Sequence, residues 1–260
     1  MSDELLEKFQ AIMPKCFFCQ AKHGGEGYEG YRMGDVVSGV EPPDFAYICP
    51  GCQSRRAEFA EIMSNRRKDF YFRDMLRERA LFDYDERFSL PNVFEDIRSA
   101  NSELFAMLDQ HPLPESIWIH GKYGLGKSHV SRSVGNRYVE TREGAALLPG
   151  PRLRNIGEEW GLKREALFKP YCKVPLLIID DIDKALKWTD NSLEALWTIT
   201  DERANRSLRT IITSQVDPAV FFKGMERIVP GSGSFILSIL DRLKPLSVFE
   251  FQGRPRRGED

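Results

Sequence analysis

The chain has 260 residues, of which 42% are hydrophobic and 29% are charged, and its formal net charge is −2. These values are ordinary for a soluble globular protein, and they exclude a global field that would favour nucleic acid or a membrane surface. The amino terminus lacks the apolar core of a signal peptide, and the longest apolar run, residues 174–179, is far too short to span a bilayer. We therefore expect a cytoplasmic protein with no membrane partner.

Four of the five cysteines form two Cys-x-x-Cys pairs, Cys16 with Cys19 and Cys49 with Cys52. A chain without a signal peptide resides in a reducing compartment, where such pairs favour metal over disulfides. Two tight turns of this kind can present their thiolates tetrahedrally to Zn²⁺, with no open coordination position. We predict that residues 1–54 form a structural zinc ribbon that binds a partner. The alternative is two unrelated pairs of reduced cysteines.

Residues 55–83 are dense in charge and helical in pattern, with arginines interleaved with aromatic residues. Such a stretch can contact a nucleic-acid backbone, but its interspersed acidic residues favour a solvated helix that bridges two domains. We predict a charged helical linker here. A third and larger domain then occupies residues 84–260.

The segment Gly121–Ser128 fits the phosphate-binding pattern G-x-x-x-x-G-K-[ST]. Residues 116–120 predict a buried strand before it, and residues 129–140 predict a helix after it. In that context the glycines let backbone N–H groups wrap a phosphate, and the helix amino terminus adds partial positive charge. Lys127 is predicted to reach the β- and γ-phosphates of ATP, and the Ser128 hydroxyl to bind Mg²⁺. The predicted nucleotide-binding residues here are Gly121, Lys122, Tyr123, Gly124, Leu125, Gly126, Lys127, Ser128 and His129.

A second stretch with clear chemistry, residues 174–181, is an apolar run that ends in Asp180 and Asp181. This is the pattern of a Walker B strand. Asp180 is predicted to hold Mg²⁺ at the strand tip, and Asp181 to orient or deprotonate the water that attacks ATP. Because Asp is one methylene shorter than the Glu usual in fast P-loop ATPases, we expect slow or conditional hydrolysis.

Helix and strand patterns continue through the rest of this region. Apolar residues recur at helical spacing in residues 92–108, 152–168 and 193–204. Residues 208–215 predict another buried strand, and its polar tip, Gln215, can contact both the γ-phosphate and the attacking water. Residues 246–251 predict a further strand. With the P-loop, these patterns predict an α/β fold.

The succession GKYGLGKSH, LLIIDDID, RTIITSQ, LDRL and a terminal G-x-x-x-R resembles the DnaC/DnaI/IstB group of AAA+ ATPases. These are bacterial and phage helicase loaders and transposition ATPases. The resemblance covers residues 84–260 and implies a three-layer P-loop core with a parallel sheet. It also implies that Gln215 is sensor 1, that Arg242 is an arginine finger reaching a neighbour's nucleotide, and that Arg257, beside the equally basic Arg256, is sensor 2. The alternative for Arg242 is a surface salt bridge.

The same resemblance implies a function. It points to an ATPase that loads a hexameric DnaB-type helicase onto single-stranded DNA during replication initiation. ATP, Mg²⁺ and Zn²⁺ would be its cofactors, and ATP would drive homo-oligomer assembly and partner release. One alternative is an IstB-like transposition helper acting on duplex DNA. Another is a small-molecule P-loop kinase with a zinc insertion, which would need an acceptor site and a lid.

Overall fold

The computed structural model describes residues 29–31, 46–48, 50–78, 81–159, 161–184 and 188–253. The chain divides into two compact units, Met1–Phe72 and Arg73–Asp260. The three-part division expected from the sequence, 1–54, 55–83 and 84–260, stays a prediction. Within the described ranges, no helix is both long and apolar enough to cross a membrane.

The described part of the first unit contains a small antiparallel sheet and most of a long helix, whose last residues, from Arg73 on, belong to the second unit. Strand β1 (Glu29–Tyr31) pairs with β2 (Ala46–Ile48), and a 3-10 helix, η1 (Pro50–Arg55), leads into α2 (Arg56–Glu78). Helix α2 covers most of the stretch predicted to be helical.

The predicted zinc site falls mostly outside the described residues. Cys52 lies in η1, whereas Cys16, Cys19 and Cys49 are not among the residues that the structure describes. In the described part of the chain, no group of three or more His, Cys, Asp or Glu side chains is placed to hold a metal ion. The zinc ribbon therefore stays a prediction.

The second unit is built on a parallel sheet of five strands, in the order β4-β5-β6-β3-β7. The strands are β3 (Ser116–His120), β4 (Ala145–Pro149), β5 (Leu176–Asp180), β6 (Arg209–Ser214) and β7 (Leu246–Glu250). Strand β5, which lies between β4 and β6, is buried along its whole length. A parallel sheet covered on both faces needs near-continuous apolar strands, which is why the apolar runs were readable in the sequence. The predicted α/β fold is confirmed.

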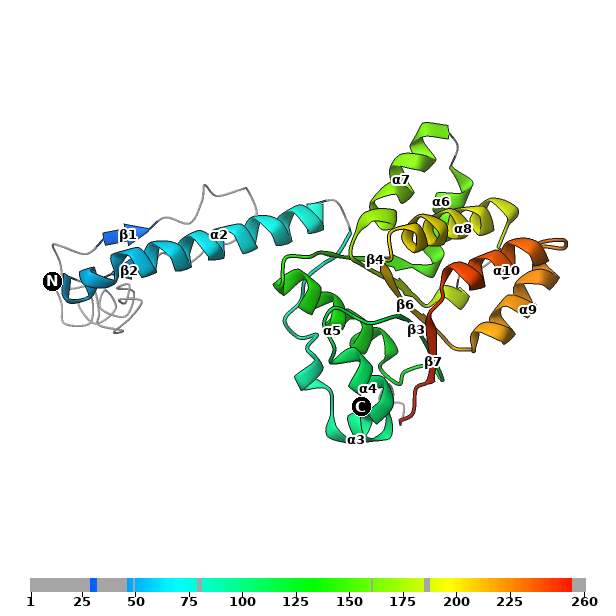
Figure 1. Cartoon of the computed structure of the whole chain (residues 1–260), viewed down its shortest axis with the longest axis horizontal. Coiled ribbons are helices and arrows are strands. Elements are labelled where there is room, and N and C mark those ends of the chain that lie inside the picture. Colours follow the sequence, from blue (N-terminus) through cyan, green and yellow to red (C-terminus); the bar gives the residue numbers. More distant parts are fainter. Residues whose placement is uncertain are drawn as a thin grey trace, which may run out of the picture. The chain divides into compact units, whose positions relative to one another are not determined.

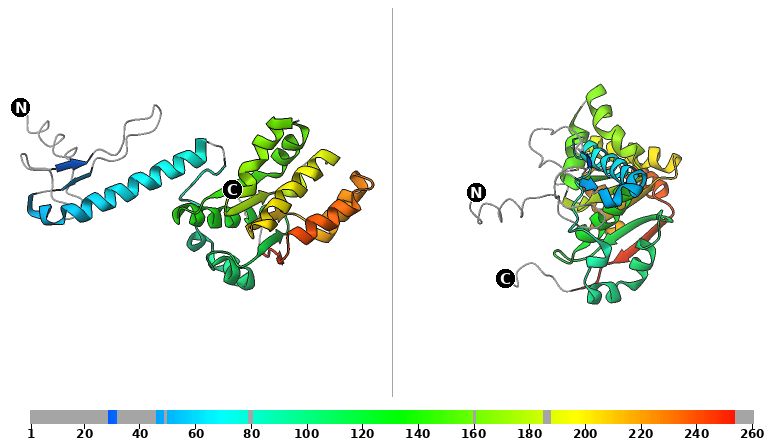
Figure 2. Two further views of the ribbon diagram at one scale, coloured as in Figure 1. Left: turned by 45° about the horizontal axis from the view of Figure 1, so that its top comes forward. Right: turned by 90° about the vertical axis from the view of Figure 1, so that its left-hand side faces the viewer.

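Helices cover both faces of this sheet and give the three layers that the resemblance implied (Figures 1 and 2). On one side lie α3 (Glu95–Ala100), α4 (Ser102–Leu108) and α5 (Lys127–Glu140). On the other side lie α6 (Gly150–Glu158), α7 (Gly161–Lys173), α8 (Asp190–Asn205), α9 (Pro218–Ile228) and α10 (Gly233–Arg242). Apolar side chains between the layers form the core.

Two stretches predicted as single helices are each divided in two. The pattern over residues 92–108 becomes α3 and α4, which meet at Asn101. The buried Asn101 amide donates to the Gln252 carbonyl at 2.9 Å, and the Gln252 N–H donates back to Asn101 at 2.8 Å. The pattern over residues 152–168 becomes α6 and α7, because Glu159 is extended and ends α6. A long-range contact thus accompanies the break at Asn101, and an extended residue ends the helix at Glu159.

A connecting segment, residues 81–90, comes between α2 and α3 in the chain and lies along α5. The Phe82 ring sits so close to Gly135 of α5 that a Cβ there would be 2.5 Å from it. Asn136, also on α5, donates to two carbonyls of this segment. Near the end of α5, the Tyr84 hydroxyl donates to Glu140 at 2.9 Å. The segment is therefore fixed to the helix that follows the P-loop.

A buried arginine ties together the amino ends of β5 and β6. Arg203 of α8 is only 1% exposed. Its guanidinium donates to the Thr210 hydroxyl at 3.0 Å, to the carbonyls of Tyr171 and Val174 at 2.8 Å each, and to the Arg209 carbonyl. A buried charge is tolerated when every donor has a partner in this way. The network closes the amino ends of these strands, and their opposite, carboxyl ends are left to form a binding site.

Candidate nucleotide-binding site

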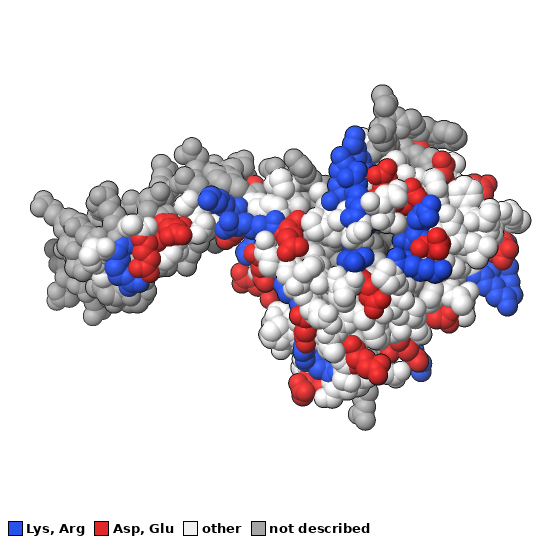
Figure 3. Space-filling view, viewed as in Figure 1, with Lys and Arg blue, Asp and Glu red and all other residues white. Residues whose placement is uncertain are grey.

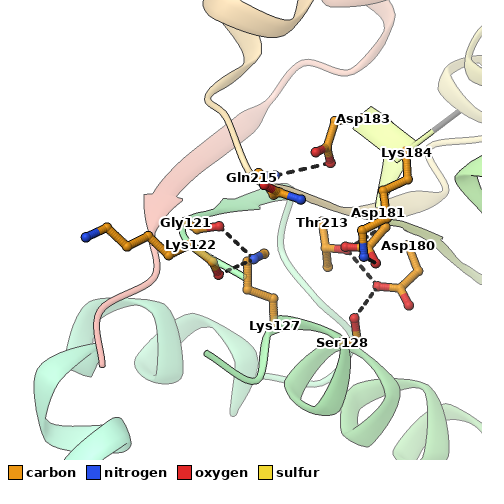
Figure 4. Close-up of polar contacts among 10 residues, drawn as sticks. All are labelled: Gly121, Lys122, Lys127, Ser128, Asp180, Asp181, Asp183, Lys184, Thr213 and Gln215. Atoms are coloured by element: carbon orange, nitrogen blue, oxygen red, sulfur yellow. Dashed lines mark hydrogen bonds and ion pairs between the residues drawn. The ribbon is translucent and has the colours of Figure 1, made fainter. Parts of the chain in front are cut away.

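The predicted site residues converge at the carboxyl ends of β3, β5 and β6 (Figure 4). The P-loop follows β3 and ends where α5 begins, while Asp180 is the last residue of β5. Ligands of open parallel sheets bind outside this edge. The topology therefore places the two strongest sequence motifs beside each other.

The P-loop has backbone angles that favour glycine. Gly124 and Gly126 adopt φ values of 80° and 102°, in the left-handed region where a side chain is strained. Gly121 has a φ of 146°, and a Cβ on it would lie 2.8 Å from the Phe251 carbonyl. The loop can thus turn tightly while β7 passes next to it.

The Lys127 side chain folds back into the P-loop. Its ammonium donates to the carbonyls of Gly121 at 2.7 Å and Lys122 at 2.9 Å, and the side chain is buried. Burial lowers the pKa of Lys127, and the charge of Asp181 opposes that effect. The Lys122 side chain points away from Lys127 (Figure 4). A phosphate oxygen would be a stronger partner for the ammonium than these neutral carbonyls.

A hydroxyl–carboxylate cluster lies next to the loop. Asp180 Oδ1 accepts hydrogen bonds from Ser128 Oγ at 2.8 Å and from Thr213 Oγ1 at 2.7 Å. Thr213 Oγ1 in turn accepts the Asp181 N–H at 2.8 Å. The structure thus brings together Ser128 and Asp180, the two residues predicted to bind Mg²⁺. Hydroxyl and carboxylate oxygens are the donors that this ion prefers, so the residues present fit it. Thr213 was missed by the sequence argument, although it lies in the predicted strand.

Asp181 occupies a left-handed backbone position with a φ of 53°, which is uncommon outside glycine. A Cβ on Gly150, at the start of α6, would lie 2.3 Å from the Asp181 carbonyl oxygen, so the two backbones are in close contact. The Asp181 carboxylate forms an ion pair of 2.5 Å with Lys184. The hydrogen bond to Asp181 raises the pKa of Lys184.

Gln215 touches this cluster through its backbone. It follows the last residue of β6, and its N–H donates to the Asp183 carboxylate at 3.1 Å. Its side chain is exposed. In this chain it is Thr213, two residues earlier, whose side chain bonds to Asp180. The sensor 1 role of Gln215 remains a prediction.

A cavity of about 560 Å³ joins the phosphate-binding loop to an apolar wall. The loop side includes Tyr123, Leu125, Lys127, Ser128 and His129, and the wall is formed by Phe88, Val93, Phe94, Ile97 and Phe251. The Phe88 ring packs edge-on against the His129 ring, with 5.1 Å between the ring centres. The Arg132 guanidinium lies over the Phe88 ring, 5.4 Å from its centre. Burial lowers the pKa of His129 and so favours its neutral form. The size and mixed lining suit a small ligand with one polar and one flat apolar part.

The two remaining predicted arginines lie elsewhere or are not described. Arg242, at the end of α10, pairs with Asp201 at 2.5 Å, and its side chain is 39% exposed. Arg256 and Arg257 lie outside the described residues, which stop at Gly253. Basic and acidic side chains are interspersed over the face of the second unit seen in Figure 3. That face offers no broad surface of a single sign.

Comparisons with known proteins test the fold. No protein-family model matches the chain, and no curated protein matches its sequence. Among solved structures, it is similar to DnaI, with a TM-score of 0.52 and 20% identity over 70% of this chain and 93% of that one. It is also similar to a DNA replication initiation factor, with a TM-score of 0.51 and 18% identity over 65% of this chain.

A third similar structure is the replication initiator DnaA bound to AMPPCP and single-stranded DNA, with a TM-score of 0.51 and 20% identity over 65% of this chain. The matched part spans about half of the initiation factor and of DnaA, 50% and 51% of their lengths. At these identities the likeness concerns the fold. The second unit therefore shares the fold of DnaI and of DnaA, in which a parallel sheet lies between layers of helices.

Proposed function

We propose that the protein is an ATPase of DNA replication that loads a hexameric DnaB-type helicase onto single-stranded DNA. The observation that carries ATP binding is the convergence of Ser128 and Thr213 on Asp180 beside the P-loop. The replication role rests on the likeness of the fold to DnaI and to DnaA, the latter bound to AMPPCP and single-stranded DNA. In this proposal ATP acts mainly as a switch for assembly and release.

The nucleotide would occupy both halves of the cavity. Backbone N–H groups of residues 121–129 and the amino end of α5 would receive the phosphates. Lys127 would exchange its two loop carbonyls for phosphate oxygens, and the wall around Phe88 would receive the base. Ser128 and Asp180 would hold Mg²⁺, which when bound neutralises phosphate charge.

Hydrolysis would use Asp181 as the base. A water oxygen forms a bond to the γ-phosphorus while the bond from that phosphorus to the β–γ bridging oxygen breaks. The electron pair leaves with ADP, and the water proton passes to the Asp181 carboxylate and then to solvent. Gln215 would orient the water, Arg242 of a neighbouring copy would stabilise the developing charge, and Arg257 would contact the phosphates. An arginine supplied by a neighbour contributes about 10³–10⁵-fold in comparable enzymes, so turnover would depend on assembly.

The first unit would recruit the helicase through a zinc ribbon. This part of the proposal rests on the spacing of Cys16, Cys19, Cys49 and Cys52 and on the placement of this module ahead of the ATPase unit. The metal would supply the folding energy that so small a module lacks.

The test is light scattering of the full chain mixed with the replicative helicase of the same genome, in ATP and in ADP. We expect a stoichiometric complex in ATP that Lys127→Ala abolishes. Lys223→Ala is the matched control, because Lys223 is an exposed lysine of α9 that does not line the cavity. ATP-dependent filaments on duplex DNA without a helicase complex would contradict the proposal and support the IstB-like alternative.

A separate test concerns Arg242. Arg242→Ala should leave ATP binding by the monomer intact and suppress hydrolysis that depends on assembly. Arg242 pairs with the carboxylates of Asp201 and Asp241. Asp201→Asn removes the charge of the nearer one and keeps the arginine, so it should retain that hydrolysis. An equal loss of hydrolysis in both variants would show that the ion pair stabilises the structure, and it would contradict the role of Arg242 as an arginine finger.

A further inference from the structure

We propose that Lys184 is a positioning residue that restrains basal ATP hydrolysis by holding the Asp181 carboxylate away from the attacking water. This inference rests on the proposed function, and it gives a physical reason for slow turnover by the isolated chain. The ion pair between Lys184 and Asp181 is the observation behind it, with Nζ and Oδ2 2.5 Å apart (Figure 4).

The backbone that presents the pair is fixed by separate contacts. The Asp181 N–H is bound by Thr213, and the Asp181 carbonyl accepts the Lys184 N–H at 2.9 Å. The Asp183 carboxylate ties the turn to Gln215, and Gly150 packs against the Asp181 carbonyl. The 3-10 turn η3 (Ile182–Lys184) therefore places the ammonium next to the carboxylate. Only the two side chains need to rotate for the pair to open.

The ammonium also lies at the phosphate end of the cavity. It sits 5.0 Å from the centre of the Tyr123 ring at the P-loop tip, and all three residues, Tyr123, Asp181 and Lys184, line the cavity. A carboxylate engaged there with an ammonium is turned toward that cation, and its oxygen is less available to a water proton. The attacking water must therefore compete with Lys184 for Asp181.

The pair is weak enough to open. The two side chains are 38% and 27% exposed, and partly exposed ion pairs of this kind shift an equilibrium by roughly two- to five-fold. Removing the cation should raise the basal hydrolysis rate by that factor. The opposite role, in which Lys184 binds the γ-phosphate directly, predicts a slower rate and weaker ATP binding.

The experiment measures single-turnover hydrolysis of γ-labelled ATP and the ATP dissociation constant, with the full chain kept dilute and monomeric. Lys184→Met retains the length of the side chain and removes its charge, and Lys184→Arg retains the pair. Lys244→Met is the matched control, because Lys244 forms an exposed pair with Asp241 at the same three-residue spacing, outside the cavity.

We expect Lys184→Met to hydrolyse ATP two- to five-fold faster with an unchanged dissociation constant, while Lys184→Arg and Lys244→Met match the wild type. Because Lys184→Arg keeps the ion pair while changing the side chain, its wild-type rate would separate loss of the pair from a merely structural effect of substitution at residue 184. An unchanged or slower rate in Lys184→Met would overturn the inference, and so would the absence of turnover in both the wild type and Lys184→Met. If ATP still binds in those cases, the proposed nucleotide site stands. Absence of ATP binding by the wild type would overturn the proposed function and this inference with it.

Discussion

The contact between Gly150 and Asp181 makes a substitution at residue 150 a direct probe of the hydrolysis site. An alanine Cβ at residue 150 would lie 2.3 Å from the Asp181 carbonyl oxygen, well inside the shortest real contacts near 3.0 Å. The obstructing atom belongs to the backbone, so the strand tip carrying Asp181 must retreat by roughly 0.7 Å. Since a displacement of about 1 Å can cost about 10²-fold in rate, we expect Gly150→Ala to slow hydrolysis about 10- to 100-fold.

The assay is single-turnover hydrolysis beside ATP binding, which should be unchanged because the P-loop is not touched. Gly224→Ala on α9 is the matched control, since a Cβ there meets nothing within 4 Å. It should leave the rate unchanged and stabilise the helix by up to about 1 kcal/mol. In an Asp181→Ala background, Gly150→Ala should cause no further loss of rate. A wild-type rate in Gly150→Ala, or a full additional loss in the double variant, would refute the argument.

Two more outcomes follow from the structure, and a third follows from the cysteine spacing in the sequence. Arg203→Met leaves several buried carbonyls without a partner and should lower the free energy of unfolding by about 3 kcal/mol or more in urea titrations. Arg206→Met, at the exposed residue that follows the same helix, should lower it by less than about 0.5 kcal/mol, and equal losses would contradict the role of the network. Burial raises the pKa of the Cys172 thiol from 9.0 to about 11, so the thiol ionises at lower pH in the unfolded chain than in the folded one. The free energy of unfolding should therefore fall as the pH rises from about 9 to about 11. Native Cys172 should also resist alkylation at pH 8, and fast labelling of the native protein, detected by mass spectrometry, would contradict this. Cys49→Ser should release zinc measured by elemental analysis and leave ATP binding intact, and concurrent loss of ATP binding would show that the two units depend on each other.

The sequence predicted the parts of the site whose signals are local. The strand before the P-loop and β5 are apolar runs because a buried parallel sheet requires them, and the glycines of the loop mark backbone angles that other residues avoid. Asp180 could be placed because it ends such a run. These inferences needed no knowledge of distant contacts.

The parts that were missed depend on register and packing between distant segments. The polar end of residues 208–215 was visible, but the strand ends at Ser214, so Thr213 points at Asp180 and Gln215 leaves the ladder. The contact of Gly150 with Asp181 arises because Pro149 pairs with Asp180 across β4 and β5. The apolar wall around Phe88 forms because the connecting segment is bound to α5, some 50 residues away in sequence.

The same connecting segment determines where a stable fragment of the second unit can begin. The Leu81 carbonyl accepts the Leu147 N–H at 2.7 Å, and Leu147 belongs to β4, an outer strand of the sheet. A fragment beginning at residue 84 would lose this contact together with Phe82, leaving the Leu147 N–H of an edge strand unpaired beside a newly exposed apolar surface. Such edges pair with other chains, so this fragment should aggregate. A fragment that begins before Arg73, whose guanidinium stacks on the Tyr84 ring at 3.8 Å, retains both contacts and should stay monomeric in the absence of ATP.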